Sequence, residues 1–531
     1  MDRRVFYISI MVLLGASTLH AQQSSSFSAY KFVRFLQYVS SDYVDTVNPN
    51  RLVDEAIGSI LEKLDPHSIY ISKEDVQAMN EPLEGNFEGI GVEFNIMDDT
   101  LMVVNPIPSG PSQKVGIIAG DRIVQIDGKN IANIGLKTTD VHKYLRGPKG
   151  TKVNIMVKRK GIADLIEFKI IRDKIPIFSI DAAYMVDTRI GYIKINRFAV
   201  TTDQEFNEAL RKLKEKKMKD LIIDLRGNGG GMLNSAVYIA DHFLEKGREI
   251  VYTEGRNSPK TDFLATDDGE MTKGRLVIMI DEGSASASEI LAGAIQDWDR
   301  GIIIGRRSFG KGLVQNQMPL PDGSMIRLTV ARYYTPTGRL IQRPYNDGNL
   351  EKYYKDINDR YSKGELFHSD SIKLPDSLKF KTLAKNKIVY GGGGIMPDIF
   401  VALDTSFYSN YYGKMVRAGL IYQFVLTWVD SNRAQLTKDY TNFEKFNKRF
   451  QVSDQMIEEL VAAAEKQKIP RDPQGLNTSI VELRKQIKGL VAQSLFNTSQ
   501  YFEITNQDNS VYQKAIEILY NWDKYKVLVF E

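Results

Sequence analysis

The stretch Leu276-Val-Ile-Met-Ile-Asp-Glu-Gly-Ser-Ala-Ser-Ala-Ser-Glu289 precedes an amphipathic segment that runs from Ile290 to Trp298. Five apolar residues in a row predict a strand, and the serines stand at its junction with a helix. The same pattern recurs on both sides: apolar runs at 191–195, 221–225 and 302–304 alternate with amphipathic segments at 203–217 and 232–246. Alternation of strands and helices predicts an α/β domain, which we place at 174–403.

Parts of this domain are less regular. The polar stretch 253–274 is expected to be a surface loop, and 345–390, which is rich in Lys, Asp and Tyr, is expected to be an irregular excursion. The basic run 211–219 lies on a helix whose apolar positions face one way. We therefore interpret it as a solvated face rather than a nucleic-acid or lipid site.

Other patterns flank the α/β domain. Apolar spacing predicts helices over 28–79 in an N-terminal helical region, 22–82, with one helix ending at Asp65-Pro66. Short β-rich segments broken by glycine predict a small β-barrel module at 83–173. A helical region follows at 404–531. Its expected helices cover 409–436, 441–467, 477–496 and 510–523. The fold class is multi-domain, α/β in the core and α+β as a whole.

Composition excludes several kinds of chemistry. The 531 residues include no cysteine and five histidines, which excludes a disulfide framework, a thiolate nucleophile and a Cys-ligated metal. We expect no metal and no other cofactor. The net charge of +4 over the whole length is too small to indicate a nucleic-acid partner. Catalysis built from Ser and Lys is compatible with these exclusions.

Residues 1–21 are expected to be an export signal. Asp2-Arg3-Arg4 precedes the apolar run Val5–Leu14, and small residues lead to Ala21, after which we expect cleavage. A membrane anchor is the alternative, but the apolar run is shorter than the roughly 20 residues that a spanning helix needs. The mature protein is therefore expected to be exported, soluble and periplasmic or otherwise extracytoplasmic.

The serine cluster has two interpretations. A serine at a strand–helix junction is exposed, and the N–H of the next residue can face a developing oxyanion. Alternatively, one of Ser284, Ser286 and Ser288 caps the helix, with Glu289 completing a capping box. Taken by itself, a serine-rich helix start favours the cap.

Two glycine-rich segments accompany the serines. Asp224-Leu-Arg-Gly-Asn-Gly-Gly-Gly231 follows a strand, and its glycines suit either a tight turn or the close approach of backbone N–H groups to a ligand. In Gly310-Lys-Gly312, Lys311 is a candidate general base if burial keeps it neutral. Gln315 has the same strand parity and could orient the amine. A solvated loop lysine is the competing interpretation.

Five motifs occur in an order that resembles the C-terminal processing peptidases, also called tail-specific proteases. They are Gly85-Asn-Phe-Glu-Gly-Ile-Gly-Val-Glu-Phe94, Leu145-Arg-Gly-Pro-Lys-Gly-Thr151, Gly283-Ser-Ala-Ser-Ala-Ser-Glu289, Ser308-Phe-Gly-Lys-Gly-Leu-Val-Gln315 and Tyr334-Thr-Pro-Thr-Gly338. The resemblance covers about residues 30–402.

The resemblance implies a serine endopeptidase with a PDZ domain ahead of its catalytic core. It assigns Ser286 as the nucleophile, Lys311 as the general base and Gln315 as the residue that orients the lysine. It also implies that the N–H groups of Gly230 and Ala287 bind the oxyanion.

The resemblance further identifies the module at 83–173 as the PDZ domain, which captures a protein's free C-terminus at a sheet edge. It implies that Gly89, Ile90, Gly91, Val92 and Phe94 bind that tail. Arg146 lies where such a domain meets the protease body, and either a sensing role or an ordinary strand-end arginine is compatible with its position.

Two other functions compete with this one. A non-catalytic PDZ scaffold would bind tails without cleaving them, and a serine hydrolase triad would combine a serine with His242 and Asp241. No Gly-x-Ser-x-Gly elbow accompanies the latter. The expected partners are protein or peptide substrates with accessible C-terminal tails. The helical termini are compatible with a homo-oligomer, and no stable membrane insertion is expected after the signal is removed.

Overall fold

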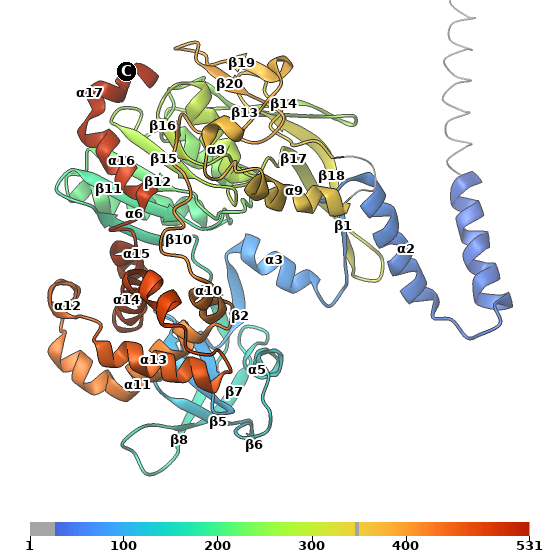
Figure 1. The fold of residues 1–531 in the computed structure, drawn as a ribbon. Helices are drawn as coiled ribbons and strands as arrows, with labels where there is room; N and C mark the ends of the chain where they lie inside the picture. The colour runs from blue at the N-terminus through green and yellow to red at the C-terminus, as the bar shows by residue number, and fades with distance from the viewer. Residues whose placement is uncertain (1–26, 346–349, 530–531) are drawn as a thin grey trace, which may run out of the picture. The chain divides into compact units, whose positions relative to one another are not determined.

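The computed structural model describes residues 27–345 and 350–529 (Figure 1). They form two compact units. The smaller contains the described residues up to 74 together with 315–329, 345 and 350–353, and the larger contains the remainder. The predicted export signal, 1–21, lies outside the described residues.

The smaller unit begins with a helix over residues 27–42 and continues with α2 (Pro49–Leu64). As predicted, α2 ends immediately before Asp65-Pro66. The prediction of helix up to residue 79 is wrong at β1 (Ile69–Ile71), which pairs antiparallel with Met325–Arg327 of β18 (Met325–Tyr334). The Asp65 carboxylate makes the turn by accepting the N–H groups of His67 and Ser68 at 2.8 and 2.9 Å.

A six-stranded sheet forms the centre of the larger unit. Its strands in spatial order are β10 (Ile180–Met185), β11 (Ile190–Ile195), β12 (Asp220–Asp224), β15 (Leu276–Ile280), β16 (Ile302–Gly305) and β21 (Ile399–Phe400). The four strands predicted from apolar runs are all present and run parallel, while β10 is antiparallel to β11.

Both faces of this sheet are covered. Ile193, Ile223 and Ile278 pack in one buried cluster with residues of α6 (Thr202–Glu215), α7 (Leu233–Asp241) and α8 (Ala287–Asp297). The alternate residues Tyr192, Ile222 and Val277 pack on the other face against α16 (Ser510–Tyr520), which lies along the sheet (Figure 1). Burial on both faces explains why the strands are continuous apolar runs.

Two predictions for the less regular stretches are wrong. The expected surface loop at 253–274 contains most of a hairpin, β13 (Glu249–Gly255) and β14 (Ser258–Leu264). Most β14 side chains are exposed on both faces, so the strand lacks the alternation that would have revealed it. The expected irregular excursion contains α9 (Leu350–Ser362) and the hairpin β19 (Lys379–Lys381) and β20 (Ile388–Tyr390). Strand β17 (Leu313–Pro319) pairs with β18.

The β-rich module forms a second sheet with its own buried core. Its order is β3 (Val92–Met97), β4 (Thr100–Pro106), β5 (Arg122–Ile126), β7 (Lys152–Lys158) and β8 (Ile166–Ile171). An Asp127-Gly128 turn joins β5 to β6 (Lys129–Asn130), with both residues at positive φ. The module's helices are α4 (Pro111–Lys114) and α5 (Thr138–Leu145). Helix α3 (Val76–Glu84) precedes this sheet, and β2 (Asn86–Gly89), at the start of the module, pairs with β9 (Asp173–Pro176) at its end.

The C-terminal region is helical, as predicted, with more breaks than expected. Its helices are α10 (Asn410–Arg417), α11 (Leu420–Asp439), α12 (Phe443–Arg449), α13 (Asp454–Lys466), α14 (Pro473–Leu495), α15 (Thr498–Thr505), α16 and α17 (Trp522–Tyr525). Gly419, at φ 64°, separates α10 from α11, and the Ser453 side chain caps α13. These two positions divide segments that apolar spacing joined.

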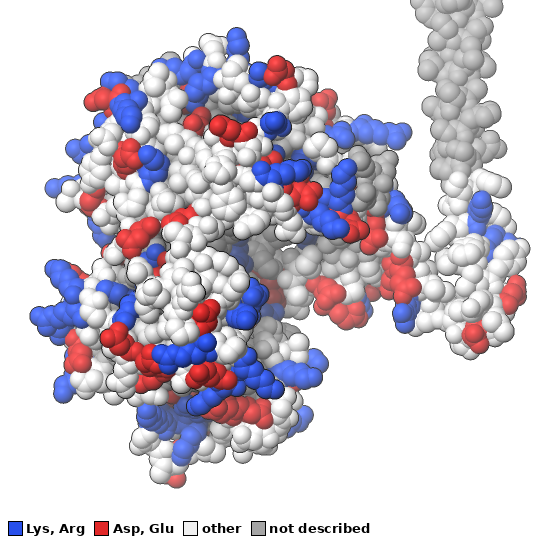
Figure 2. All heavy atoms as spheres, in the orientation of Figure 1, with Lys and Arg blue, Asp and Glu red and all other residues white. Residues whose placement is uncertain are grey.

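Charged side chains are mixed on the surface. Figure 2 shows Lys and Arg interspersed with Asp and Glu over the visible face. In the basic run at 211–219, Arg211, Lys212 and Lys214 each pair with a carboxylate within 2.8 Å. These pairs agree with the interpretation of that run as a solvated face.

Candidate active site

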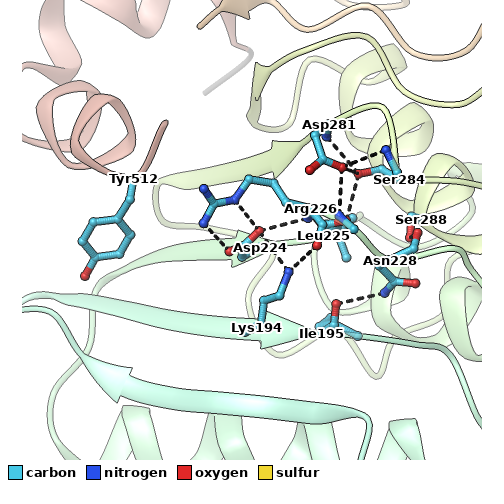
Figure 3. A network of polar contacts seen from close by, with 12 residues as sticks. Lys194, Ile195, Asp224, Leu225, Arg226, Asn228, Asp281, Ser284, Ser288 and Tyr512 are labelled. Atoms are coloured by element: carbon cyan, nitrogen blue, oxygen red, sulfur yellow. Dashed lines mark hydrogen bonds and ion pairs between the residues drawn. The ribbon is translucent and has the colours of Figure 1, made fainter. Parts of the chain in front are cut away.

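The three serines at the start of α8 differ in exposure. Ser284 and Ser288 are fully buried, and their hydroxyls donate to the carbonyl oxygens of Leu225 and Asn228 at 2.8 and 2.9 Å (Figure 3). Ser286 is partly exposed and has φ 55° and ψ −115°. Positive φ is uncommon outside glycine, and backbone strain of this kind clusters at active sites. Of the three serines, Ser286 is the one that is not fully buried.

The backbone around Lys311 requires glycine. Gly310 has φ 88°, and a methyl group added to it would lie 3.0 Å from the N atom of Gly394. A methyl group on Gly312 would lie 2.9 Å from the N atom of Gln342. The loop is therefore packed tightly against two other backbone segments, and the Lys311 residue between the glycines is half-buried.

The Tyr333 hydroxyl connects the Ser286 and Lys311 segments. It is hydrogen-bonded to the carbonyl oxygen of Ser286 at 3.1 Å and to the carbonyl oxygen of Lys311. Tyr333 is 1% exposed, so water does not compete effectively for these bonds. The two residues that the sequence pairs functionally are thus held by one buried side chain.

Glu289 provides a second connection between these segments. One carboxylate oxygen accepts the N–H groups of Ser286 and Lys311, both at 2.9 Å. The other accepts the N–H of Gly310 at 2.7 Å and the Ser308 hydroxyl. Burial raises the pKa of Glu289 to about 7, although these four donors oppose the rise. Of the predicted capping box only the Glu289 half is formed: its carboxylate takes the N–H of Ser286 while the Ser286 side chain makes no cap hydrogen bond, and the same carboxylate also reaches the lysine loop.

The predicted oxyanion donors belong to neighbouring residues. A methyl group on Gly230 would lie 2.7 Å from Cβ of Ser286 and 3.0 Å from the N atom of Ala287. Ala287 is the first residue of α8, where helix geometry leaves N–H groups without an intrahelical acceptor. The N–H of Gly230 donates to Oδ1 of Asn228 at 2.8 Å.

The β-rich module carries a groove between β3 and α5. All five predicted tail-binding residues, Gly89, Ile90, Gly91, Val92 and Phe94, line it together with Phe87, Val141, His142, Leu145 and Arg146. The ring of His142 stands edge-on to that of Phe94 at 5.7 Å, and burial and the nearby Arg146 lower its pKa. Strand β3 ends the order of its sheet, so its outer edge borders the groove.

Arg146 extends from the groove toward α3. Its guanidinium is 2.5 Å from the carboxylate of Glu81 on α3 and lies over the ring of Phe87. Glu81 is largely buried, which makes the ion pair less exposed to screening than a surface pair. The interpretation of Arg146 as a strand-end residue is wrong, because it is the C-cap residue of α5, and its side chain joins the groove to α3.

Comparison with known sequences finds three family models along the chain. Peptidase family S41 matches residues 189–348, the PDZ domain matches 102–159, and a family of unknown function, DUF8443, matches 411–497. The carboxy-terminal-processing protease of Bartonella bacilliformis is 37% identical over 339 residues, which cover 63% of this chain and 77% of that protein. The carboxy-terminal processing protease CtpA of Bacillus subtilis is 33% identical over 367 residues, covering 67% and 78%.

The chain belongs to the carboxy-terminal processing proteases. It is thus a serine-type peptidase with a PDZ domain, and the non-catalytic scaffold loses its support. A second Bacillus subtilis relative, the processing protease CtpB, is 34% identical over 333 residues, covering 62% of this chain and 68% of that protein.

Gln315 of the processing protease lies on β17, four residues after Lys311, and belongs to the smaller unit. Within that unit its amide nitrogen donates to the carbonyl oxygen of His67. A fixed amide nitrogen also fixes the direction of the amide oxygen, which is the atom that could accept a bond from an amine.

The competing triad is not assembled in the processing protease. His242 is 4% exposed and packs against the rings of Phe206 and Tyr238, and neither ring nitrogen has a hydrogen-bond partner among the described residues. The Asp241 carboxylate accepts the N–H and the hydroxyl of Thr266, both at 2.6 Å. His242 is therefore a core residue.

Sequence reasoning missed the wider roles of Glu289 and Tyr333. The capping pattern identified Glu289 but gave no sign of its bonds to the lysine loop. Tyr333 carried no signal, because its partners are 47 and 22 residues away along the chain. Over the described ranges of the processing protease, no helix is both long and apolar enough to cross a membrane.

Proposed function

We propose that Ser286 is the nucleophile of this processing protease and Lys311 its general base, with Gln315 orienting the lysine. The observation that carries the proposal is the double connection of the Ser286 and Lys311 backbones through Tyr333 and Glu289. A nucleophile and its base must be held at hydrogen-bond reach, and shared buried partners supply that constraint.

In the proposed reaction, the neutral Lys311 amine takes the hydroxyl proton as Ser286 Oγ attacks the carbonyl carbon of the scissile bond. The tetrahedral intermediate collapses when the ammonium returns this proton to the leaving amine, which gives an acyl-enzyme. Lys311, neutral once more, then takes a proton from water as the water oxygen attacks the ester carbonyl, and returns it to Ser286 Oγ when the acyl–oxygen bond breaks and the acid leaves. Each proton taken by the amine is returned within the cycle.

The oxyanion would be bound by the N–H groups of Ala287 and Gly230. The Gly230 N–H is engaged by Asn228, so it would exchange this acceptor for the oxyanion. An anionic acceptor makes a stronger hydrogen bond than a neutral amide oxygen, so the exchange favours the transition state.

The substrate class follows from the groove. We propose that a protein's C-terminal tail adds to the edge of β3, with its carboxylate at the N–H groups of residues 89–91 and its apolar side chain against Val92 and Phe94. The Arg146–Glu81 pair at one end of the groove is a candidate sensor of the bound tail.

The setting of this activity is also part of the proposal. An exported enzyme that uses serine and lysine needs neither a thiol nor a metal, and the sequence contains no cysteine. We propose export through cleavage after Ala21, and assembly of copies through the helical termini. N-terminal sequencing of secreted protein and sedimentation of the mature chain test these two points.

Cleavage of a loosely folded protein with an apolar C-terminal tail tests the catalytic assignment. We expect Ser286→Ala and Lys311→Ala each to abolish cleavage, while circular dichroism and tail-peptide binding stay unchanged. The same substrate with a charged tail should be cut more slowly by the wild type. Because the base is a lysine, activity should rise toward alkaline pH. Full turnover by a folded Ser286→Ala variant would contradict the assignment.

A further inference from the structure

Arg226 stands at the root of the glycine loop that approaches Ser286. It precedes Gly227–Gly231 and directly follows β12 and Leu225. Its carbonyl oxygen accepts the Lys194 ammonium, and the next N–H, of Gly227, donates to Asp281 at 2.8 Å (Figure 3). The position of residue 226 therefore fixes where the loop begins.

The Arg226 side chain extends to residues that lie 280 and 283 positions further along the chain. Its guanidinium donates to Oδ1 of Asn509 at 2.6 Å and to Oδ1 of Asn506 at 3.3 Å. On its other edge it donates to both carboxylate oxygens of Asp224, at 2.9 and 2.7 Å. Four guanidinium bonds thus join the end of β12 to the connection between α15 and α16.

The two asparagines are themselves fixed. Asn506 is 4% exposed, and its amide nitrogen donates to the Tyr184 hydroxyl at 3.1 Å. Asn509 caps α16 by accepting the N–H of Tyr512 at 3.1 Å. The ring of Tyr512 packs edge-on against Tyr192, whose hydroxyl donates to Asp224 at 2.7 Å. The contacts form a closed circuit between the C-terminal helices and the sheet.

The charges in this circuit are buried and paired. Burial by itself would raise the pKa of Asp224, but Arg226 and Lys194 outweigh it and hold that pKa well below its usual range. Lys194 is 3.4 Å from the same carboxylate. Removing an acceptor from a buried guanidinium leaves donors unsatisfied, so the side chain would move to recover a partner.

We propose that Asn506 and Asn509 are positioning residues for catalysis, which set the oxyanion loop through Arg226. This rests on the proposed function of Ser286 and extends the active-site support to a segment outside all three matched families. The C-terminal helices α15 and α16 are then part of the catalytic machinery, since they close one face of the sheet and hold the loop's first side chain.

Substitution of the two asparagines in the full chain tests this role. We expect the double variant Asn506→Ala, Asn509→Ala to lower kcat by about tenfold or more, with KM changed by less than about twofold, because loop position affects the transition state rather than tail binding. Asn509→Asp keeps both the cap and the acceptor, so its kcat should exceed that of Asn509→Ala and approach the wild type.

Asn442→Ala is the matched control. Asn442 caps α12 in the same way, accepting the N–H of Lys445 at 2.9 Å, in the same helical region. Its loss should lower the thermal midpoint while leaving kcat unchanged. A folded double variant with wild-type kcat, or a kcat loss in Asn442→Ala as large as that of the double variant, would overturn the inference.

The single variants and Ser286→Ala distinguish a failure of the positioning role from a failure of the proposed function. If the double variant does not fold, the single variants decide, and equal kcat for Asn509→Ala, Asn509→Asp and the wild type overturns the inference. An active Ser286→Ala variant would instead overturn the proposed function itself. Inactive Ser286→Ala combined with unchanged asparagine variants would refute only the positioning role.

Discussion

Two glycine loops of the larger unit offer main-chain N–H groups in contrasting settings. The loop at 227–231 is surrounded by polar groups: Asp281 accepts the N–H of Gly227, and the Asn228 amide donates to the carbonyl oxygen of Ile195 at 3.0 Å. The loop at 89–91 lies among apolar side chains, and its main polar support is Ser112, whose N–H and hydroxyl both donate to the carbonyl oxygen of Ile90.

This difference matches the two tasks. The oxyanion forms only as the substrate reacts and is absent from the bound substrate, so its donors must be held in position beforehand, and a polar network supplies that rigidity. A groove that accepts tails of different sequence binds the ground state and benefits from apolar walls that adapt. Damage to the first loop should therefore lower kcat, and damage to the second should raise KM.

The largest effect is expected from Gly230→Ala. Residue 230 has φ 98°, and the added methyl group would lie 2.7 Å from both the carbonyl oxygen of Ala285 and Cβ of Ser286. Backbone cannot move aside as a side chain can, so we expect kcat to fall by about 10³ or more, with tail binding intact. Gly247→Ala is the control, because residue 247 has φ 80° with no heavy atom within 4 Å. Equal losses in both variants would show that backbone strain, rather than contact with Ser286, is responsible.

Glu289→Gln should have the next largest effect. The amide nitrogen must replace one of two oxygens that each accept a main-chain N–H, so at least one N–H loses its acceptor. We expect kcat to fall by about 10²-fold with KM nearly unchanged. Glu205→Gln is the control, since Glu205 accepts the N–H groups of Ser179 and Ile180 in the larger unit and has no contact with Ser286 or Lys311 in the described structure. A similar kcat loss in both variants would contradict the role of Glu289.

The same substitution should change how stability depends on pH. Burial raises the pKa of Glu289 to about 7, so the folded protein keeps a proton that the unfolded chain releases near pH 4.5. Stability from this group is therefore complete below pH 4.5 and is lost as pH rises through 7. The difference between Glu289→Gln and the wild type in free energy of unfolding should move by about 3 kcal/mol in favour of the variant over this range. Parallel denaturation midpoints at pH 4.5 and 8 would contradict the shift.

The sequence predicted those parts of the fold whose burial leaves a pattern. Strands β15 and β16 are continuous apolar runs, and β11 and β12 are mostly apolar, because helices cover both faces of their sheet. The β13–β14 hairpin could not be predicted in this way, because β14 has exposed side chains on both faces. Helix breaks at Gly419 and Ser453 depend on single residues within otherwise continuous apolar spacing.

In the candidate site, too, local motifs could be predicted from the sequence and long-range contacts could not. Ser286 and Lys311 could be proposed because each lies in a compact motif that resembles the processing peptidases, although the local pattern by itself favoured a helix cap and a solvated lysine. The contacts of Tyr333 and Asn509 depend on partners 47 and 283 residues away, and a single sequence carries no record of such distances. The proposed nucleophile and base could thus be named from the sequence, while the residues that connect their backbones became visible only in three dimensions.

A smaller effect, on KM rather than on kcat, is expected from Gly91→Ala in the tail-binding loop. Residue 91 has φ 75°, and the new methyl group would lie 2.9 Å from the end of the Ile175 side chain and 3.4 Å from Cδ of Pro111, so its closest neighbour is a side-chain end rather than backbone. We expect KM for tail-bearing substrates to rise about tenfold, with kcat and the cleavage of tail-less peptides unchanged. Gly128→Ala, in the same module at φ 78° with no neighbour within 4 Å, should leave KM unchanged. A fall in kcat for Gly91→Ala would erase the contrast between the two loops.

The smallest effect on activity is expected from His242→Phe. The ring lies 5.5 Å from that of Phe206 and 5.2 Å from that of Tyr238, so a phenyl group fits the same apolar surroundings, and kcat should equal that of the wild type. The stability that His242 contributes should depend on pH in the opposite direction to that of Glu289. Burial lowers the pKa of His242, so the folded protein resists a proton that the unfolded chain binds below about pH 6.5. Stability from this group is present above that pH and is lost as the pH falls. At pH 5 the denaturation midpoint of the variant should therefore rise relative to that of the wild type. A large loss of kcat in His242→Phe would restore the triad as a rival to Lys311.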